Sequence, residues 1–115
     1  EAVRHAEVYR GSFAISVCPS ENVESPTIVG AQAANELLNI IGIKASFVLT
    51  EYNDKIYISS RSIDEINVQI IMEKLGGGGH LNVAGAQLEG VTIVQAKRMI
   101  QDTLDEMLKE GDIEE

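Results

Sequence analysis

The run Gly76 to Gly79, followed by His80, constrains this chain more than any other feature of its sequence. Four consecutive glycines are costly to order, because glycine loses more backbone freedom on folding than any other residue. Without Cβ atoms, the backbone of Gly77, Gly78 and Gly79 can turn its N–H groups into a concave nest that binds a phosphate. His80 adds a donor that becomes cationic when protonated. The run therefore predicts an anion site, with the alternative that Gly76 stops a helix and the rest is a turn.

Length and composition indicate one ordinary globular domain. The chain has 115 residues, 44% of them hydrophobic and 23% charged, which suits a single core. No apolar run approaches the roughly 18 residues of a membrane span, and no signal-peptide pattern opens the chain. We expect no direct membrane contact. Since the first residue is Glu1, we also expect the sequence to be a piece of a longer protein.

The formal charge of −9 argues against a surface built for nonspecific nucleic-acid binding, which needs a basic stripe. An acidic domain can still hold a small anion where donors converge. Seven acidic residues crowd the last segment and predict a solvated helix face and tail: Asp102, Asp105, Glu106, Glu110, Asp112, Glu114 and Glu115. The single cysteine, Cys18, excludes an intramolecular disulfide, which suits the cytoplasm. Its apolar surroundings predict a buried structural thiol.

The first forty residues predict a linker, a strand and a helix. Residues 1–10 are short and mixed and indicate the tail of a connecting helix. Apolar alternation over residues 13–18 predicts a strand, which the polar loop 19–25 ends. Ser25-Pro26 is typical of a helix start, and apolar residues then repeat at helical spacing until Gly42 closes the helix.

Residues 44–61 predict a hairpin, because two β-rich runs flank Asn53-Asp54, a pair that tolerates positive φ. Its second strand carries Arg61, the only arginine between Arg10 and Arg98. A surface salt bridge is the alternative to a binding role for Arg61.

Two further helices follow the hairpin. Asn67 predicts the cap of a short helix with apolar residues at i, i+3, i+4 and i+7. Thr92 and Gln95 form a capping box that opens a final helix ending near Gly111. Together these patterns predict an α+β domain over residues 11–115, a mixed β-sheet with packed helices, preceded by the linker.

Residues 57–88 (YISSRSIDEINVQIIMEKLGGGGHLNVAGAQL) resemble the DHH-associated domain, the C-terminal lobe of DHH-family phosphodiesterases. Four short motifs carry the resemblance at their proper spacing: Ser60-Arg61-Ser62, Ile66-Asn67-Val68, Gly77-Gly78-Gly79-His80 and Ala84-Gly85-Ala86. The resemblance spans essentially the whole chain. It is strongest to family members that hydrolyse cyclic di-AMP, with oligoribonuclease-type members close behind.

The resemblance implies a division of labour within a longer parent enzyme. A DHH lobe of the same chain would hold two divalent metal ions, typically manganese, that activate water against a phosphodiester. The domain described here would close over a cyclic dinucleotide or short oligonucleotide. By motif, His80 and the amides of Gly77, Gly78 and Gly79 would hold a phosphate, while Arg61 would pair with a phosphate or contact a base. The parent would turn cyclic di-AMP into linear pApA.

The metal centre of such an enzyme is missing from this sequence. There is no Asp-His-His motif, and the two histidines, His5 and His80, stand in no metal-ligand spacing with carboxylates. We therefore expect no catalytic residue, metal or cofactor in this chain, and no hydrolysis by it alone. The parent is expected to present this domain to the cytoplasm, either free or through a membrane anchor.

Two alternatives stay open. The same lobe could serve an enzyme that degrades short RNA or single-stranded DNA. It could also be a non-catalytic module similar to the domain that ends alanyl-tRNA synthetases, which serves tRNA contact and self-association; the acidic charge speaks against tRNA, while dimerisation through a strand edge or the final helix stays open. Base preference does not follow from the sequence.

Overall fold

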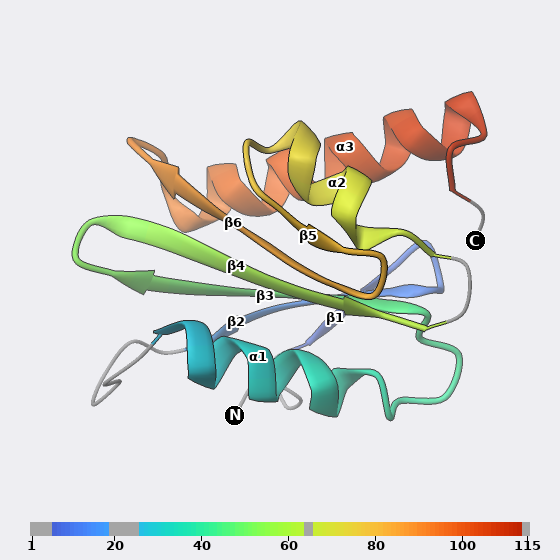
Figure 1. Cartoon of the computed structure of the whole chain (residues 1–115), viewed down its shortest axis with the longest axis horizontal. Coiled ribbons are helices and arrows are strands. Elements are labelled where there is room, and N and C mark those ends of the chain that lie inside the picture. Colours follow the sequence, from blue (N-terminus) through green and yellow to red (C-terminus); the bar gives the residue numbers. More distant parts are fainter. Residues whose placement is uncertain (1–5, 19–25, 64–65, 114–115) are drawn as a thin grey trace.

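The computed structural model describes residues 6–18, 26–63 and 66–113. These residues form three helices and six strands (Figure 1). In chain order they are β1 Glu7–Tyr9, β2 Phe13–Cys18, α1 Pro26–Leu37, β3 Ala45–Tyr52, β4 Lys55–Ser62, α2 Val68–Lys74, β5 Gly78–His80, β6 Val83–Glu89 and α3 Ile93–Glu110. None of the helices in this part of the chain is both long enough and apolar enough to cross a bilayer.

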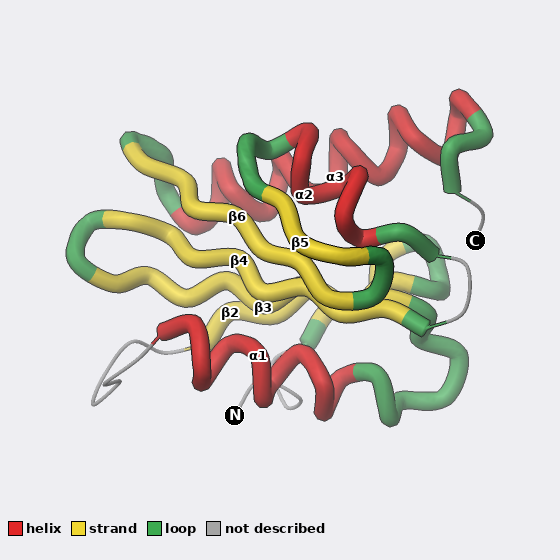
Figure 2. The backbone as a smooth tube through the Cα atoms, in the orientation of Figure 1, coloured by secondary structure: helices red, strands yellow, loops and turns green. Residues whose placement is uncertain are grey.

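All six strands belong to one sheet, in the order β1-β2-β3-β4-β6-β5 (Figure 2). The pair β2 and β3, which α1 connects, is parallel. Every other neighbouring pair is antiparallel. The predicted α+β fold, a mixed sheet with packed helices, is therefore confirmed. The short strands β1 and β5 form the two edges.

Helices cover both faces of the sheet, with α1 on one face and α2 and α3 on the other (Figure 1). The central strand β3 is consequently buried on both sides, and Phe47, Val48 and Leu49 are all fully buried. Val48 packs in the smaller apolar cluster with Ala33, Ala34 and Leu37 of α1. Phe47 and Leu49 belong to the larger cluster, which includes the apolar sides of α2 and α3.

The local signals for turns and helix ends are confirmed. Asn53 and Asp54 join β3 to β4 with φ of 53° and 63°, the left-handed geometry that a two-residue hairpin needs. The Asn67 side chain accepts two backbone N–H groups at the start of α2. Thr92 opens α3 through a capping box, and Gly111 ends that helix with φ of 81°. Each of these turns and caps depends on residues only a few positions apart in the chain, so the local sequence was enough to predict it.

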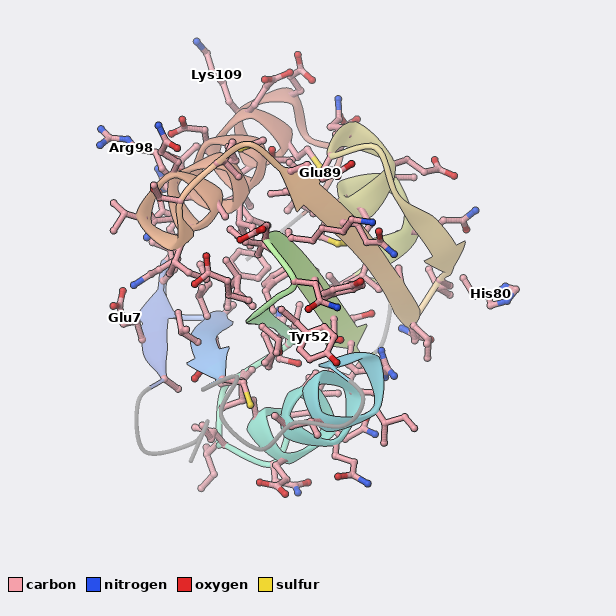
Figure 3. The ribbon with its side chains drawn as sticks, turned by 90° about the vertical axis from the view of Figure 1, so that its left-hand side faces the viewer. Glu7, Tyr52, His80, Glu89, Arg98 and Lys109 are labelled. Carbon is pink, nitrogen blue, oxygen red and sulfur yellow. The ribbon has the colours of Figure 1, made fainter. Side chains whose placement is uncertain are left out.

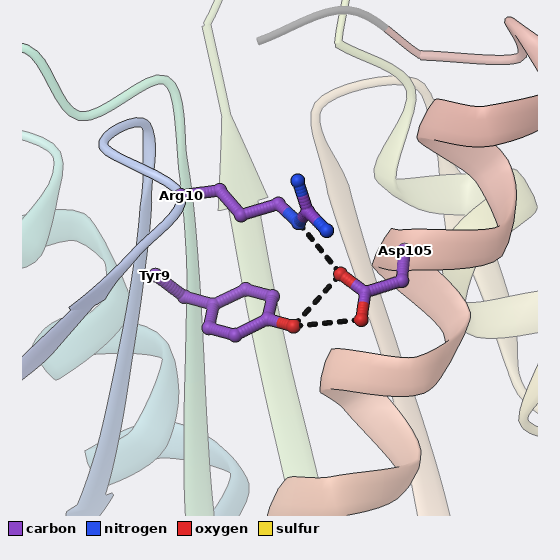
Figure 4. Close-up of polar contacts among 3 residues, drawn as sticks. All are labelled: Tyr9, Arg10 and Asp105. Carbon is purple, nitrogen blue, oxygen red and sulfur yellow. Dashed lines mark hydrogen bonds and ion pairs between the residues drawn. The ribbon is translucent and has the colours of Figure 1, made fainter.

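The N-terminal segment differs from the prediction. Where a helix was expected over residues 1–10, Glu7–Tyr9 form strand β1, antiparallel to β2; residues 1–5 lie outside the described part. The Tyr9 hydroxyl donates to both carboxylate oxygens of Asp105 on α3, at 2.7 and 2.8 Å, and Arg10 Nε donates to the same group at 2.7 Å (Figure 4). Asp105 is partly exposed, as expected of a solvated helix face, but it also fastens α3 to this edge of the sheet, which the sequence did not indicate.

The first helix also ends earlier than predicted. Helix α1 stops at Leu37 and does not continue to Gly42, and Ile41, the last apolar residue before that glycine, is fully exposed. Gly42 instead takes φ of 90° within the connection to β3. The predicted thiol burial is confirmed, since Cys18 is buried at the end of β2. The polar loop over residues 19–25, including the expected Ser25 cap, lies outside the described residues.

Candidate functional site

A cavity of about 530 Å³ lies between helix α1 and the strands β4 and β6. Its walls combine polar side chains, bare glycine backbone and small apolar residues: Ala31, Tyr57, Ile58, Ser59, Arg61, Gly76, Gly77, Ala84, Gly85, Ala86 and Gln87. Arg61 is the only charged residue among them. The cavity can therefore take a ligand with one anionic end.

The pairing of β4 with β6 arranges the cavity floor in three rows. Residues directly opposite each other in an antiparallel pair point to the same face. The rows are Tyr57 with Gln87, Ser59 with Gly85, and Arg61 with Val83. These rows lie on the face of the sheet that α1 covers. Ser46 on β3 lies opposite Arg61 and therefore points to the same face, and its hydroxyl donates to the carbonyl oxygen of Ala34 in α1 at 2.7 Å. Alternate residues of β4 thus line one side of the site.

Gly85 keeps the middle of this floor bare. A Cβ at position 85 would lie 2.8 Å from the carbonyl oxygen of Ile58 on the neighbouring strand, closer than real Cβ atoms approach. The glycine therefore lets β6 pack tightly on β4 and leaves room above the sheet for a ligand.

Arg61 is a half-buried cation at one end of the cavity. Its Nη1 donates to the carbonyl oxygen of Ser60 at 2.8 Å. Burial lowers the pKa of the Arg61 guanidinium, because desolvation disfavours its charge. Within the described residues no carboxylate forms an ion pair with it, so the salt-bridge alternative finds no support there. A guanidinium in this position has donors left for a carboxylate or phosphate.

The glycine run begins as a helix end and continues as a strand. Gly76 has φ of 88°, and its amide donates to Glu73 O at 3.1 Å. The Gly77 amide donates to Met72 O at 2.8 Å, a bond that closes the end of α2. The interpretation that Gly76 stops a helix is confirmed, but residues 78–80 form strand β5 where a loop was predicted. The Gly77 amide is already used inside the domain.

Close packing explains two of the four glycines. A Cβ at Gly77 would lie 2.7 Å from Cα of Ala86 and closer still to the carbonyl oxygen of Gly85. A Cβ at Gly79 would meet the backbone of β6 in the same way, whereas one at Gly78 would meet nothing within 4 Å. Close packing against β6 therefore leaves no room for a side chain at Gly77, just before the edge strand, or at Gly79 within it.

The predicted site residues fall into two neighbouring groups. Arg61 and Gly77 line the cavity, whereas Gly78, Gly79 and His80 lie on the adjacent edge strand outside its lining. His80 is exposed and points away from the body of the domain (Figure 3). Since Arg61 and His80 both lie opposite Val83, they share a face two strand spacings apart, about 10 Å.

Sequence reasoning missed the other polar residues of the cavity. Tyr57 and Ser59 stand at positions i−4 and i−2 from Arg61 on β4, and this period of two, which puts them on the face of Arg61, was the signal that could have found them. Gln87 had no such signal, because its place opposite Tyr57 depends on the pairing of β4 with β6.

No metal set is found among the described residues, since no three His, Cys, Asp or Glu side chains lie together as ligands.

The sequence of this chain matches the model of the DHHA1 domain over residues 11–110, and the chain belongs to that family. The cyclic-di-AMP phosphodiesterase PdeA of Listeria monocytogenes is 46% identical over 104 residues, which are 90% of this chain and 16% of PdeA. GdpP of Bacillus subtilis, also a cyclic-di-AMP phosphodiesterase, is 37% identical over 111 residues, 95% of this chain and 17% of GdpP. The resemblance inferred from the motifs is confirmed.

A solved structure supports the fold. An exopolyphosphatase-related protein from Bacteroides fragilis superposes with a TM-score of 0.80 at 22% identity, covering 92% of this chain and 32% of that chain. The similarity extends to the arrangement of the sheet and helices. The chain spans only 16–17% of the length of PdeA and GdpP.

Proposed function

We propose that this chain is the substrate-binding lobe of a phosphodiesterase that hydrolyses cyclic di-AMP to linear pApA, and that it holds a nucleotide phosphate at Arg61. The observation that carries the proposal is the half-buried Arg61 at one end of a cavity in which no other charged side chain is found among the described lining residues. The identity of 37–46% to two cyclic-di-AMP phosphodiesterases, over nine-tenths or more of this chain, supports the choice of substrate.

The phosphate contacts divide between the cavity and the edge strand. In the cavity, the planar guanidinium of Arg61 offers two parallel N–H groups to one phosphate. At the edge of the sheet, only every second backbone N–H group of β5 points away from β6. The outward N–H groups are therefore either the one of Gly79 or the two of Gly78 and His80. These amides and the His80 ring can meet a second phosphate about 10 Å away. A cyclic dinucleotide carries two phosphates, which suits this division.

Catalysis is assigned to another part of the parent enzyme. Two divalent metal ions, typically manganese, would supply an activated water from a DHH lobe outside this chain. The residues described here bind and orient the nucleotide. We accordingly expect the 115-residue chain alone to be inactive.

An NMR titration of the labelled chain with cyclic di-AMP, short oligoadenylate and AMP tests the proposal. We expect saturable shifts at the Arg61 side chain and at the amides of residues 78–80, with the largest affinity for the cyclic dinucleotide. Arg61→Ala should abolish the shifts, and Arg61→Lys should weaken binding because ammonium lacks the bidentate geometry. Arg98→Ala is the matched control, since Arg98 is exposed on α3 and does not line the cavity.

Each contrary outcome has a definite meaning. If no phosphate ligand shifts Arg61 at millimolar concentration, the proposed binding role of the cavity is wrong. If oligoadenylate binds more tightly than the cyclic dinucleotide, the substrate is a short oligonucleotide instead.

A further inference from the structure

Resting on this proposed function, we infer that Tyr57 and Gln87 form the nucleobase subsite of the cavity and that the pair selects adenine. The two residues lie directly opposite each other on β4 and β6, and both line the cavity at the end away from Arg61. Base recognition would then belong to this domain.

The charge distribution fixes the direction of the bound nucleotide. Among the lining residues that the structure describes, Arg61 is the only charged one, so the phosphate goes to that end. Tyr57 lies four residues away along β4, a separation of about 13 Å at the rise of an extended strand. This separation is comparable to the length of an extended nucleotide. The sugar then passes over Ser59 and the bare backbone of Gly85 in the middle row.

Tyr57 offers a stacking surface for the base. Its side chain is half-buried, so the ring is held by its neighbours while part of it faces the cavity. A nucleobase stacks well on such a ring, and this contact tolerates any base because every base has a π-face. Tyr57 thus supplies affinity and leaves the choice of base to another residue.

Gln87 offers the hydrogen bonds that distinguish adenine. Its exposed side chain lies in the same row as Tyr57, where opposing Cβ atoms are about 5 Å apart. A carboxamide carries a donor beside an acceptor, which matches the N7 acceptor and N6 donor of adenine in a bidentate pair. Guanine presents two acceptors, N7 and O6, at the same edge, so the amide oxygen of Gln87 would find no partner.

Within the described residues, neither the Tyr57 hydroxyl nor the Gln87 amide makes a hydrogen bond that would hold it away from a ligand. Both groups can turn toward the base without breaking an internal contact. The remaining walls near them, Gly76, Gly77 and Ala86, are small and uncharged. They leave space for a planar ring.

The test measures dissociation constants of the 115-residue chain for AMP, GMP and ribose 5-phosphate by NMR titration. We expect AMP to bind on the order of tenfold more tightly than either of the others. Tyr57→Leu should weaken AMP binding about tenfold while leaving ribose 5-phosphate unchanged. Gln87→Met removes both the donor to N7 and the acceptor for N6 at a similar side-chain size and should abolish the preference for AMP over GMP. Tyr52→Leu, on the neighbouring strand outside the lining, is the control.

The outcomes separate this inference from the proposed function. If all three ligands shift Arg61 with equal affinity, or if the Tyr57 and Gln87 variants leave the ratios unchanged, the base subsite is wrong and the phosphate site stands. If no ligand shifts Arg61, the proposed function fails and the subsite with it. Unchanged amide spectra of the free variants show that the fold is retained.

Discussion

Gly77→Ala provides the sharpest test of why the glycine run exists. Its added Cβ would lie 2.7 Å from both Cα and Cβ of Ala86, and nearer still to the carbonyl oxygen of Gly85. Real Cβ atoms essentially never approach so closely, so β5 must move away from β6. Because two of the three atoms belong to backbone, a rotamer change cannot relieve the clash.

The expected loss in the free energy of unfolding follows from this geometry. Overpacking a filled site destabilises proteins by about 1–3 kcal/mol, and a clash with backbone places Gly77→Ala at the upper end, about 3 kcal/mol. For a domain of this size about 1 kcal/mol corresponds to roughly 4 °C in Tm, so the melting temperature should fall by about 12 °C. The loss should also be visible as a lower urea midpoint at unchanged m-value.

Gly78→Ala is the matched control, one residue away. Neither Gly77 nor Gly78 has a positive φ, so the two substitutions differ mainly in the space around the new Cβ. A Cβ at Gly78 meets nothing within 4 Å, and the loss of unfolded-state entropy should stabilise that variant by about 0.4–1 kcal/mol. Thermal and urea unfolding of both variants, followed by circular dichroism, decides the matter. Equal stability of Gly77→Ala and the unmodified chain would refute the packing argument.

Two other predictions concern polar contacts. Hydrogen bonds, first from Tyr9 and then from Arg10, hold the pKa of the Asp105 carboxyl below its usual range. The ionised carboxylate therefore stabilises the folded state fully above the unfolded pKa of about 3.9, and this stabilisation is lost as pH falls through the lower pKa of the folded state. The stability difference between the unmodified chain and Asp105→Asn should therefore shrink below about pH 4 in urea titrations; a constant difference down to pH 2 would contradict this. The buried Thr50 hydroxyl has no hydrogen-bond partner among the described residues, so Thr50→Val should raise stability by about 1 kcal/mol. Ser46→Ala, which removes a buried hydroxyl that does have a partner, should lower it by about 1 kcal/mol. A loss of stability in both variants would contradict the unbonded state of the Thr50 hydroxyl.

Local features of this chain were predictable because their physics is local. The hairpin turn at Asn53 and Asp54, the Asn67 cap and the Gly111 helix end each depend on a backbone preference or a bond within about four residues. The segment 1–10 was predicted wrongly because its short strand pairs with β2 across a turn at Arg10 and Gly11, which take positive φ. Only the bond from Tyr9 to Asp105, 96 residues away in sequence, is a long-range contact that no local pattern reveals.

The candidate site was only partly predictable. Arg61 was found from its motif and does line the cavity. The phosphate nest expected from Gly77 to Gly79 was an inference from composition, and two of these glycines have a packing role that composition does not reveal. Tyr57 and Gln87 come together through a strand pairing that joins residues 30 positions apart.

The sequence by itself therefore determined the fold class, the caps and turns, and the family, because short motifs and hydrophobic periods carry that information. The tertiary structure alone decided that residues 78–80 are an edge strand, that Gly77 and Gly79 are bare because β6 lies against them, and where the cavity opens. These features arise from contacts between distant segments, whose geometry depends on how the whole sheet packs.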